Sequence, residues 1–294
     1  MKALILLLAC TILASACTSL DLTPIVDQSS PGATAPEFPT SIAQAAPIPT
    51  MDMPSETIVA DSSTVLSTLP ASPKPPDPNI LWSADFEDGT LSQWYSDFGG
   101  GVFNLGSGRV VVTDKMAHSG RFSAAMTIDD GAGIPQAVRL FRWKENPAEA
   151  YYGVWFLFPQ RYKPALWWNV LQFKTNAAYP LDTIWVINVG NRPDGNLFFY
   201  LYDWQNGKTY EQTIRDVPIG QWVHVQVFYR RSTEKQGRIT LWQDGVQLFD
   251  LDGVRTATSN YVHWSVDNYT DGISPSPVTI YADDVTVSKE RVEK

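Results

Sequence analysis

Hydrophobic and polar positions alternate along the second half of this chain. Val223, Val225 and Val227 are each separated by one polar or aromatic residue, which is the period-two pattern of a strand with one apolar face. Two further alternating runs follow, joined by Asp244-Gly245, a dipeptide that readily takes the positive φ angles of a type I′ turn. This stretch therefore predicts a long strand followed by a β-hairpin.

Similar runs, rich in β-branched and aromatic residues, recur at short intervals over residues 80–288 and are separated by turn-forming dipeptides. No stretch between them has a helical hydrophobic stripe. Many short strands without intervening helices predict an all-β, antiparallel sandwich. The number of strands favours a two-sheet jelly roll over an immunoglobulin-like domain, which has fewer strands and a shorter chain.

The chain before this region has a different composition. Residues 1–17 hold a lysine, a short apolar run and small residues before Cys17, and predict a secretory signal peptide. The small residues resemble a bacterial lipoprotein cleavage box, in which Cys17 would carry the lipid. The alternative is cleavage of an ordinary signal peptide without lipidation. Residues 18–78, rich in Pro, Ser and Thr, predict a disordered linker. The linker is either a spacer that holds the domain away from the cell surface or a disordered leader whose length has no function. The folded domain is expected over residues 79–288.

Charge and composition narrow the classes of ligand. All 11 Trp and all 12 Tyr lie after residue 80, within the expected domain, and the chain has a formal net charge of −9. A secreted acidic chain without a basic run does not favour nucleic-acid binding, so we expect no nucleic-acid partner. The predicted location is extracellular, with a lipid anchor on the bacterial cell surface, and we expect a monomer.

Strand alternation also groups candidate ligand-binding residues. Trp168, Gln172 and Lys174 are spaced to share one strand face, and Tyr200 and Tyr202 are spaced to share another. Aromatic platforms and amide donors on one face of a sheet are typical of a sugar site. The alternative is that the aromatic residues line the core.

Only three histidines are present, His118, His224 and His263. His118 is predicted to lie in a turn, whereas His224 and His263 lie within strands, where either could act as a general base near neutral pH. A hydrogen-bonded structural role is the alternative for both. The sequence contains no Ser/His/Asp arrangement, zinc-ligand spacing or Gly-rich phosphate loop. It also lacks the paired carboxylates that glucanases of sandwich fold carry on one strand, which argues against hydrolysis.

Seven motifs then resemble one family of proteins. They are LWSADFEDGTLSQW, HSGRFSA, YGVWFLFP, WNVLQFK, PIGQWVHVQV, GRITLWQDG and VTIYADDVTV, and they span residues 80–288 in order. They resemble the heparin-lyase-I-like polysaccharide lyases, which belong to the concanavalin A-like lectin/glucanase jelly rolls. The resemblance implies that the ligand is a polysaccharide.

Lyases of that family cleave uronic-acid polysaccharides by β-elimination, which needs a neutralised carboxylate, a base and an acid. The resemblance implies that Arg139 or Arg142 meets the carboxylate and that Gln172 assists. It also implies that His224 and His263 are candidates for the acid and base. Lys174 stands where some relatives have a histidine.

The closing Tyr-rich strand of the motif set begins at Tyr261, which we expect to bind substrate together with Trp168, Lys174, Tyr200 and Tyr202. Asp267 stands in this strand where the relatives would have a second tyrosine, and Tyr269 follows two residues later. Because of this departure, the sequence does not decide which residues would act as the general acid and the general base.

Glu87 and Asp283 form a separate pair near the two ends of the domain. Many carbohydrate-binding jelly rolls have a similar F-E-x-G start and Y-x-D-D-V end around a structural calcium ion, which prefers oxygen ligands. The first and last strands of a jelly roll usually pair, so we expect a calcium between these carboxylates. The alternative is a solvated turn.

The sequence as a whole predicts an extracellular domain that recognises a polysaccharide. Two functions from different classes fit it. The first is a uronate polysaccharide lyase that acts by β-elimination, and the second is a non-catalytic carbohydrate-binding or adhesion module.

Overall fold

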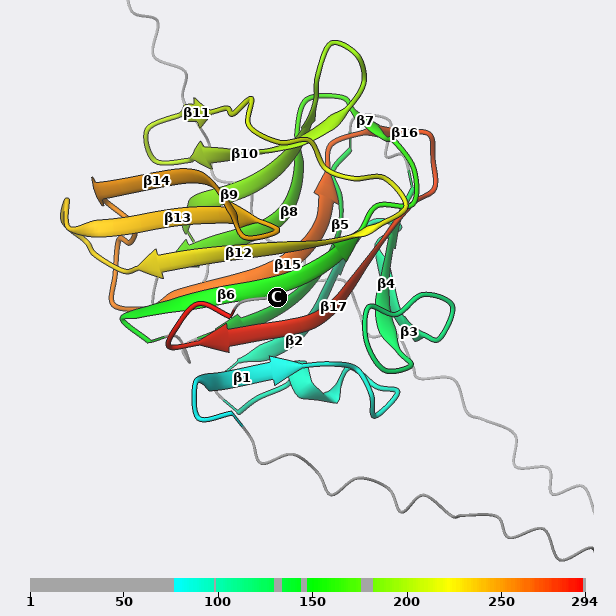
Figure 1. Ribbon diagram of the computed structural model, residues 1–294, viewed down its shortest axis with the longest axis horizontal. Coiled ribbons are helices and arrows are strands. Elements are labelled where there is room, and N and C mark those ends of the chain that lie inside the picture. The colour runs from blue at the N-terminus through cyan, green and yellow to red at the C-terminus, as the bar shows by residue number, and fades with distance from the viewer. Residues whose placement is uncertain (1–76, 98, 130–133, 144–146, 176–181, 293–294) are drawn as a thin grey trace, which may run out of the picture. The chain divides into compact units, whose positions relative to one another are not determined.

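The computed structural model describes residues 77–97, 99–129, 134–143, 147–175 and 182–292 (Figure 1). The predicted signal peptide, Cys17 and nearly all of the predicted linker lie outside the described residues. The first described strand begins at Ile80 and the last ends at Ser288. No helix within these ranges is long and apolar enough to cross a membrane.

Two antiparallel sheets contain nearly all of the described strands. We call the first sheet A; its strands are β1 (Ile80–Ala84), β3 (Arg109–Thr113), β4 (Ser123–Ile128), β6 (Glu149–Leu157), β12 (Trp222–Arg230), β13 (Gly237–Gln243), β14 (Val246–Val254) and β17 (Val278–Ser288). We call the second sheet B; its strands are β2 (Gly100–Leu105), β5 (Gln136–Trp143), β8 (Trp168–Thr175), β9 (Asp182–Asn191), β10 (Leu197–Asp203), β11 (Lys208–Tyr210) and β15 (Val262–Thr270). The remaining elements are a two-stranded ribbon of β7 (Lys163–Pro164) and β16 (Ile273–Ser274), and a short 3₁₀-helix, η1 (Ser92–Trp94).

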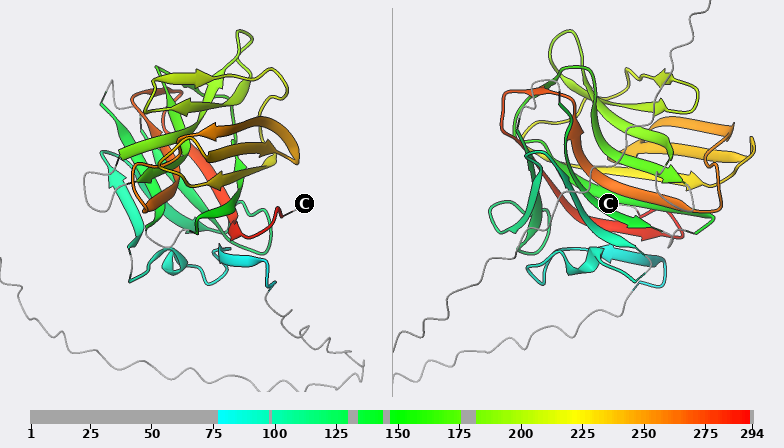
Figure 2. Two further views of the ribbon diagram at one scale, coloured as in Figure 1. Left: turned by 90° about the vertical axis from the view of Figure 1, so that its left-hand side faces the viewer. Right: turned by 180° about the vertical axis from the view of Figure 1, so that it is seen from behind.

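The order of the strands shows long-range connections in both sheets. Sheet A runs β14-β13-β12-β6-β17-β4-β3, with β1 beside β17, and sheet B runs β11-β10-β9-β8-β15-β5-β2. The two sheets are curved and stacked face to face (Figures 1 and 2). The predicted all-β, two-sheet jelly-roll sandwich is confirmed.

Alternation explains how β12 and its neighbours form. Val223, Val225 and Val227 are fully buried and point into the core, while the residues between them point to the other face. Asp244 and Gly245, with φ of 52° and 80°, form the turn between β13 and β14, which confirms the predicted hairpin.

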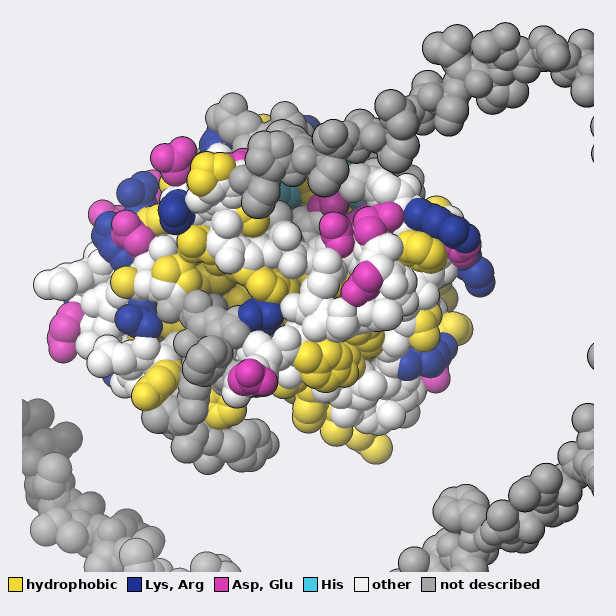
Figure 3. All heavy atoms as spheres, turned by 90° about the horizontal axis from the view of Figure 1, so that it is seen from below, with side chains coloured by type: hydrophobic (Ala, Val, Ile, Leu, Met, Phe, Trp, Pro, Cys, Tyr) yellow, Lys and Arg dark blue, Asp and Glu magenta, His cyan; other side chains and the backbone are white. Residues whose placement is uncertain are grey.

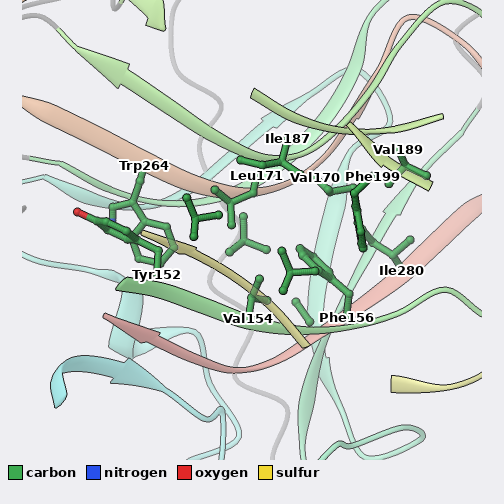
Figure 4. Packing of buried hydrophobic residues seen from close by; sticks show 14 of the residues in the cluster. Tyr152, Val154, Phe156, Val170, Leu171, Ile187, Val189, Phe199, Trp264 and Ile280 are labelled. Carbon is green, nitrogen blue, oxygen red and sulfur yellow. The ribbon is translucent and has the colours of Figure 1, made fainter. Parts of the chain in front are cut away.

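The core lies between the two sheets. Tyr152, Val154 and Phe156 of β6 point from sheet A toward sheet B, where Leu171 and Trp264 meet them (Figure 4). All five side chains are at most 2% exposed. Burial of this apolar surface is the main stabilising contribution to a domain that has no described helix beyond one short turn.

A β-bulge in β8 decides which of its side chains reach the core. The register shifts between Asn169 and Leu171, so that Val170 and Leu171 are consecutive and both fully buried. Beyond the bulge, Gln172 points to the outer face of sheet B; before it, Trp168 points inward. The prediction that Trp168 shares a face with Gln172 and binds substrate is therefore wrong.

Charged side chains are interspersed on the face seen in Figure 3, where Lys and Arg lie beside Asp and Glu. Among the described residues, ion pairs at the surface of sheet A include Arg230 with Asp252 and Arg238 with Asp250, each at 2.7 Å. Such pairs contribute little stability individually. This face therefore does not present a continuous surface of one charge.

Asn268 ties the two sheets together through hydrogen bonds in the core. Its side-chain amide donates to the carbonyl oxygens of Met126 on β4 (2.9 Å) and Val278 on β17 (3.3 Å), both in sheet A. Its own carbonyl oxygen accepts the indole N–H of Trp168 at 2.9 Å. The polar groups of the buried Asn268 side chain thus all have hydrogen-bond partners. Trp168 likewise gains the hydrogen-bond acceptor that a buried indole N–H needs.

We predict that Asn268→Leu, which keeps a similar volume, lowers the free energy of unfolding by roughly 2–4 kcal/mol, because three buried groups lose a partner. Chemical denaturation measures the loss. Trp168→Phe removes only one of the three hydrogen bonds and should cost less from that source. Equal stability of wild type and Asn268→Leu would show that the link does not contribute.

Candidate functional site

A groove of about 530 Å³ lies on the face of sheet B that points away from the core. Its volume falls in the usual range for ligand pockets. Strands β5, β8, β9, β10, β11 and β15 contribute to it. The residues lining it are Arg139, Leu166, Trp167, Asn169, Gln172, Lys174, Thr183, Val186, Asn188, Tyr200, Tyr202, Trp204, Thr209 and Tyr269.

Strand register arranges these side chains in rows across the sheet, because residues directly opposite in antiparallel strands share a face. One row is Tyr200, Asn188, Asn169 and Tyr269. The next is Tyr202, Val186, Gln172 and Ser265. Beyond Gln172, Lys174 lies opposite His263. The first row therefore has a phenol at each end and two amides in the middle.

Several polar atoms on this face are buried and have no hydrogen-bond partner among the described residues. They are Nε of Arg139, Oε1 of Gln172, Oδ1 of Asn188, both ring nitrogens of His263, Oγ of Ser265 and both carboxylate oxygens of Asp267. Buried polar groups are nearly always bonded, since an unmet one costs about 1–3 kcal/mol. Their gathering on one face indicates a site built to bind a polar ligand.

A larger hollow of about 780 Å³ lies elsewhere, between the β10–β11 turn and the β12–β13 turn, and includes Asp203, Lys208 and Glu234. None of the unpartnered buried atoms belongs to its lining. We therefore take the groove on sheet B as the candidate site.

Arg139 is held by packing more than by hydrogen bonds. Its guanidinium lies 4.3 Å from the ring centre of Tyr269 and 5.8 Å from that of Phe103, and its Nε is 3.7 Å from Oδ1 of Asp267. These contacts fix the plane of the guanidinium. A fixed, positively charged fork at a groove is suited to binding a carboxylate.

Lys174 is a cation in a poorly solvated place. Burial lowers the pKa of Lys174 to about 8, the charge of Arg139 adds to this lowering, and Asp267 opposes it. A lysine with such a pKa is neutral in an appreciable fraction near neutral pH. It can therefore take up a proton.

His263 is neutral at physiological pH. Burial lowers its pKa to about 3, and the positive charges of Lys174 and Arg139 add to the effect. Its ring stacks on Phe141 at 5.1 Å. A histidine with this pKa does not retain a proton near neutrality, which makes it a poor general acid or base.

The groove phenols keep their protons. Burial raises the pKa of Tyr200 to about 12, with further contributions from Glu211 and Tyr202. Burial also raises the pKa of Tyr269, against the opposing charge of Arg139. Both phenols are therefore hydrogen-bond donors across the physiological range.

Most of the predicted site residues are brought together here. Arg139, Gln172, Lys174, Tyr200 and Tyr202 line the groove, and His263 lies on the same face beside Lys174. Their catalytic and binding roles stay predictions.

The prediction that four catalytic candidates converge is wrong for His224. It lies on β12 of sheet A, on the opposite side of the sandwich, where its ring stacks on Trp155 at 4.9 Å. Tyr261 lies before β15, 41% exposed, and is not part of the groove lining. Arg142, the alternative to Arg139, points away from the groove, with its guanidinium over Trp82 and bonded to the Gln93 carbonyl oxygen.

Sequence reasoning missed several groove residues. Asn188 is a polar residue inside the apolar run of β9, a signal that could have marked it. Asn169 was hidden, because the bulge after it changes its face. Trp167 and Trp204 lie just outside strand ends, where alternation says nothing about direction.

The predicted calcium ligands have other partners in the structure. Glu87 accepts the backbone N–H groups of Arg121 and Phe122, and Asp283 accepts those of His118 and Asp284. Among the described residues, no group of three or more His, Cys, Asp or Glu side chains is arranged to hold a metal. The amides of one loop thus meet both carboxylates, and the calcium site stays a prediction.

Comparison with known proteins places the fold and the family. Residues 86–286 match the family model described as "Polysaccharide lyase", which is more than half of the chain. No curated protein matches this sequence.

Solved structures with the same architecture include several lyases. The endo-β-1,4-glucuronan lyase from the fungus Trichoderma reesei is 17% identical, with a TM-score of 0.53, covering 72% of this chain and 96% of that one. The marine alginate lyase from Aplysia kurodai is 10% identical, with a TM-score of 0.51 and coverage of 72% and 99%. A mutant of the alginate lyase Aly36B in complex with alginate trisaccharide is 16% identical, with a TM-score of 0.50 and coverage of 71% and 98%. At these identities the likeness shows the shared fold. The predicted resemblance to jelly-roll polysaccharide lyases is confirmed.

The lowered pKa of His263 predicts a pH-dependent stability. An unfolded histidine binds a proton below about pH 6.5, whereas the folded His263 stays neutral down to about pH 3. The unfolded state therefore binds more protons in this window, and acidification from pH 6.5 toward 3 lowers stability by up to about 1.4 kcal/mol per pH unit.

Comparison of wild type with His263→Phe by chemical denaturation at pH 7.5 and pH 4.5 measures this contribution. The variant, which retains a ring against Phe141, should lose less stability on acidification than wild type. Parallel losses in the two proteins would contradict the assignment.

Proposed function

The chain belongs to the polysaccharide lyase family, and from that premise we propose that its groove binds a uronic-acid polysaccharide outside the cell and cleaves it by β-elimination. The observation that carries this proposal is the groove itself, where Arg139, Gln172 and Lys174 gather among buried polar atoms that lack partners. The names of the similar structures, lyases of glucuronan and alginate, support the same class of substrate.

In this proposal the first task is to neutralise the sugar carboxylate, because that makes the neighbouring C5 proton more acidic. Arg139 is suited to it, since its guanidinium lies over the ring of Tyr269 and bears a permanent charge. The amide groups of Gln172 and Asn188 are the neighbouring donors on the same face. Both are buried, so that a hydrogen bond to a carboxylate there is only weakly screened by water.

Lys174 is our candidate for the base. With a pKa of about 8, about one in ten of its side chains is neutral at pH 7. The sequence makes His263 a candidate for this role, but its pKa of about 3 leaves it unable to hold the abstracted proton. Lys174 takes the C5 proton, and the electrons of the C5–H bond form the C4–C5 double bond as the C4–O4 bond breaks.

Tyr200 is our candidate for the acid that protonates the leaving O4 oxygen. Its phenol is largely buried and has a pKa raised to about 12, so it holds its proton until the alkoxide develops. Tyr202 lies two residues away on the same face of β10 and lines the same groove. It serves as a matched comparison.

We predict that the purified protein raises the ultraviolet absorbance of at least one of glucuronan, alginate and heparin, through the unsaturated end that elimination creates. Lys174→Ala should lower kcat by roughly 10²–10⁴-fold, the usual contribution of a positioned acid or base. Lys235→Ala, an exposed lysine outside the groove, is the control. Retained binding of these polymers with no change in absorbance would favour the non-catalytic binding module instead.

The acid role of Tyr200 predicts a contrast between two variants of one strand. Tyr200→Phe should lower kcat far more than KM, because it removes a proton donor and keeps the ring, whereas Tyr202→Phe should act mainly on KM. Steady-state kinetics on the cleaved polymer distinguish them. The opposite ranking would move the acid role to Tyr202.

The pKa of Lys174 also predicts the pH profile. Since only the neutral amine accepts a proton, kcat/KM should rise with pH up to about 8 and then level off, until the acid group loses its proton. A profile that is flat between pH 6 and 9 would exclude Lys174 as the base.

A further inference from the structure

A buried carboxylate that the proposed reaction does not use lies beside Arg139, a residue of the groove. Asp267 of β15 is fully buried, and neither of its oxygens has a hydrogen bond of ordinary geometry to a described residue, although the Ser265 hydroxyl is near enough to lower its pKa. Burial raises the pKa of Asp267, against the opposing effect of Arg139. A buried charge is costly unless it is well paired, and a negative one beside a groove for an anionic polymer also repels the ligand. Its presence there calls for a physical reason.

The contacts of Asp267 point to that reason. It lies directly opposite Arg139 in the β15–β5 register, and its Oδ1 is 3.7 Å from the Nε of Arg139. The side chain of Arg139 donates no hydrogen bond to a described residue. The ion pair with Asp267 and the rings of Tyr269 and Phe103 are therefore the contacts that fix the direction of its guanidinium. Because Asp267 engages the Nε side of the guanidinium, the terminal nitrogens are left for a ligand.

The same carboxylate acts on Lys174. The charged or titratable groups that bear on the Lys174 amine are Arg139 from β5 and Asp267 from β15, with the neutral ring of His263 directly opposite it. Arg139 disfavours the charged amine and Asp267 favours it. Among these groups Asp267 is therefore the only one that supports the basicity of Lys174.

We propose that Asp267 is a positioning residue, which holds the Arg139 guanidinium in the direction that meets the sugar carboxylate and keeps Lys174 basic enough to take the C5 proton. Its kinetic consequence rests on the proposed elimination reaction. Its charge coupling to Arg139 and Lys174 does not, and can be measured without substrate.

The test compares wild type with Asp267→Asn, which keeps the shape and removes the charge. Asp252→Asn is the matched control, because Asp252 also pairs with an arginine, but on sheet A and away from the groove. Melting temperatures establish that each variant is folded. If Asp267→Asn is not folded, Asp267→Ser, which places a hydroxyl like that of Ser265 on the same face, replaces it.

The first readout is the titration of Lys174, followed by NMR on protein whose lysines carry ¹³C-methyl groups, with the Lys174 signal assigned by its loss in Lys174→Arg. In Asp267→Asn the midpoint should move down by roughly one pH unit, as expected when a nearby opposite charge is removed. In Asp252→Asn it should stay where it is in wild type. An unmoved midpoint in the folded Asp267 variant overturns the proposal.

The second readout is the pH dependence of kcat/KM. The rising limb should move to lower pH in Asp267→Asn, and the plateau should fall several-fold, because Arg139 loses its orienting partner. In the Arg139→Gln background the same substitution should lower the plateau much less, since the two residues act as a unit. A uniform fall with an unmoved limb would mean a merely structural role.

These results also separate the two proposals. If wild type cleaves no uronate, the proposed function fails, and the titration of Lys174 alone decides the role of Asp267. If wild type is active and the titration of Lys174 is the same in Asp267→Asn, elimination stands and the role of Asp267 does not.

Discussion

The bulged pairing of β8 with its neighbours is the constraint on which the candidate site depends. The register shifts between Asn169 and Leu171 against β9 and between Val266 and Tyr269 against β15. The extra residue in β8 bends the sheet and reverses the side-chain alternation of that strand, whereas β15 keeps its alternation through the shift. Without these shifts, the groove could not present Asn169 and Gln172 on one face while Trp168 fills the core.

The titratable side chains at the groove are buried, so that their charges interact with little screening by water. The charge of Arg139 acts on the pKa of His263, Lys174 and Asp267, and Lys174 and Asp267 also act on each other. In a medium of low effective dielectric such couplings are larger than at an exposed surface. The protonation of Lys174 and that of Asp267 are therefore linked, so that a change in the charge of one is expected to shift the pKa of the other.

The fold could be predicted from the sequence to a large extent, because alternation and Asp-Gly turns are local signals. Val223 and the Asp244-Gly245 hairpin lie as the pattern indicates. The site could be predicted only in part. Gln172 and Lys174 share a face because the register shift between them places its extra residue in β9, whereas Trp168 lies before the bulge in β8 itself and turns inward.

His224 shows a different limit. The alternating pattern indicates that His224 lies on the face of β12 opposite the buried valines, and the structure agrees. Alternation gives only the face of one strand, however. The sheet to which β12 belongs follows from long-range strand pairing, which no local pattern encodes. Asp267 was recognised as a departure from the family pattern. Its interaction with Arg139 depends on register between β5 and β15, which only the folded chain shows.

The link made by Asn268 has a consequence for how such a groove can diversify. Asn268 is bonded through the core to β4 and β17, and of its two neighbours in sequence Tyr269 lines the groove while Asp267 is buried beside the groove residue Arg139. Replacing Tyr269 changes the lining of the groove, and replacing Asp267 changes the partner of Arg139, while Asn268 keeps the strand in place. Substitutions at these two positions can therefore alter the surface and charge of the groove without removing the hydrogen bonds that hold β15 to sheet A.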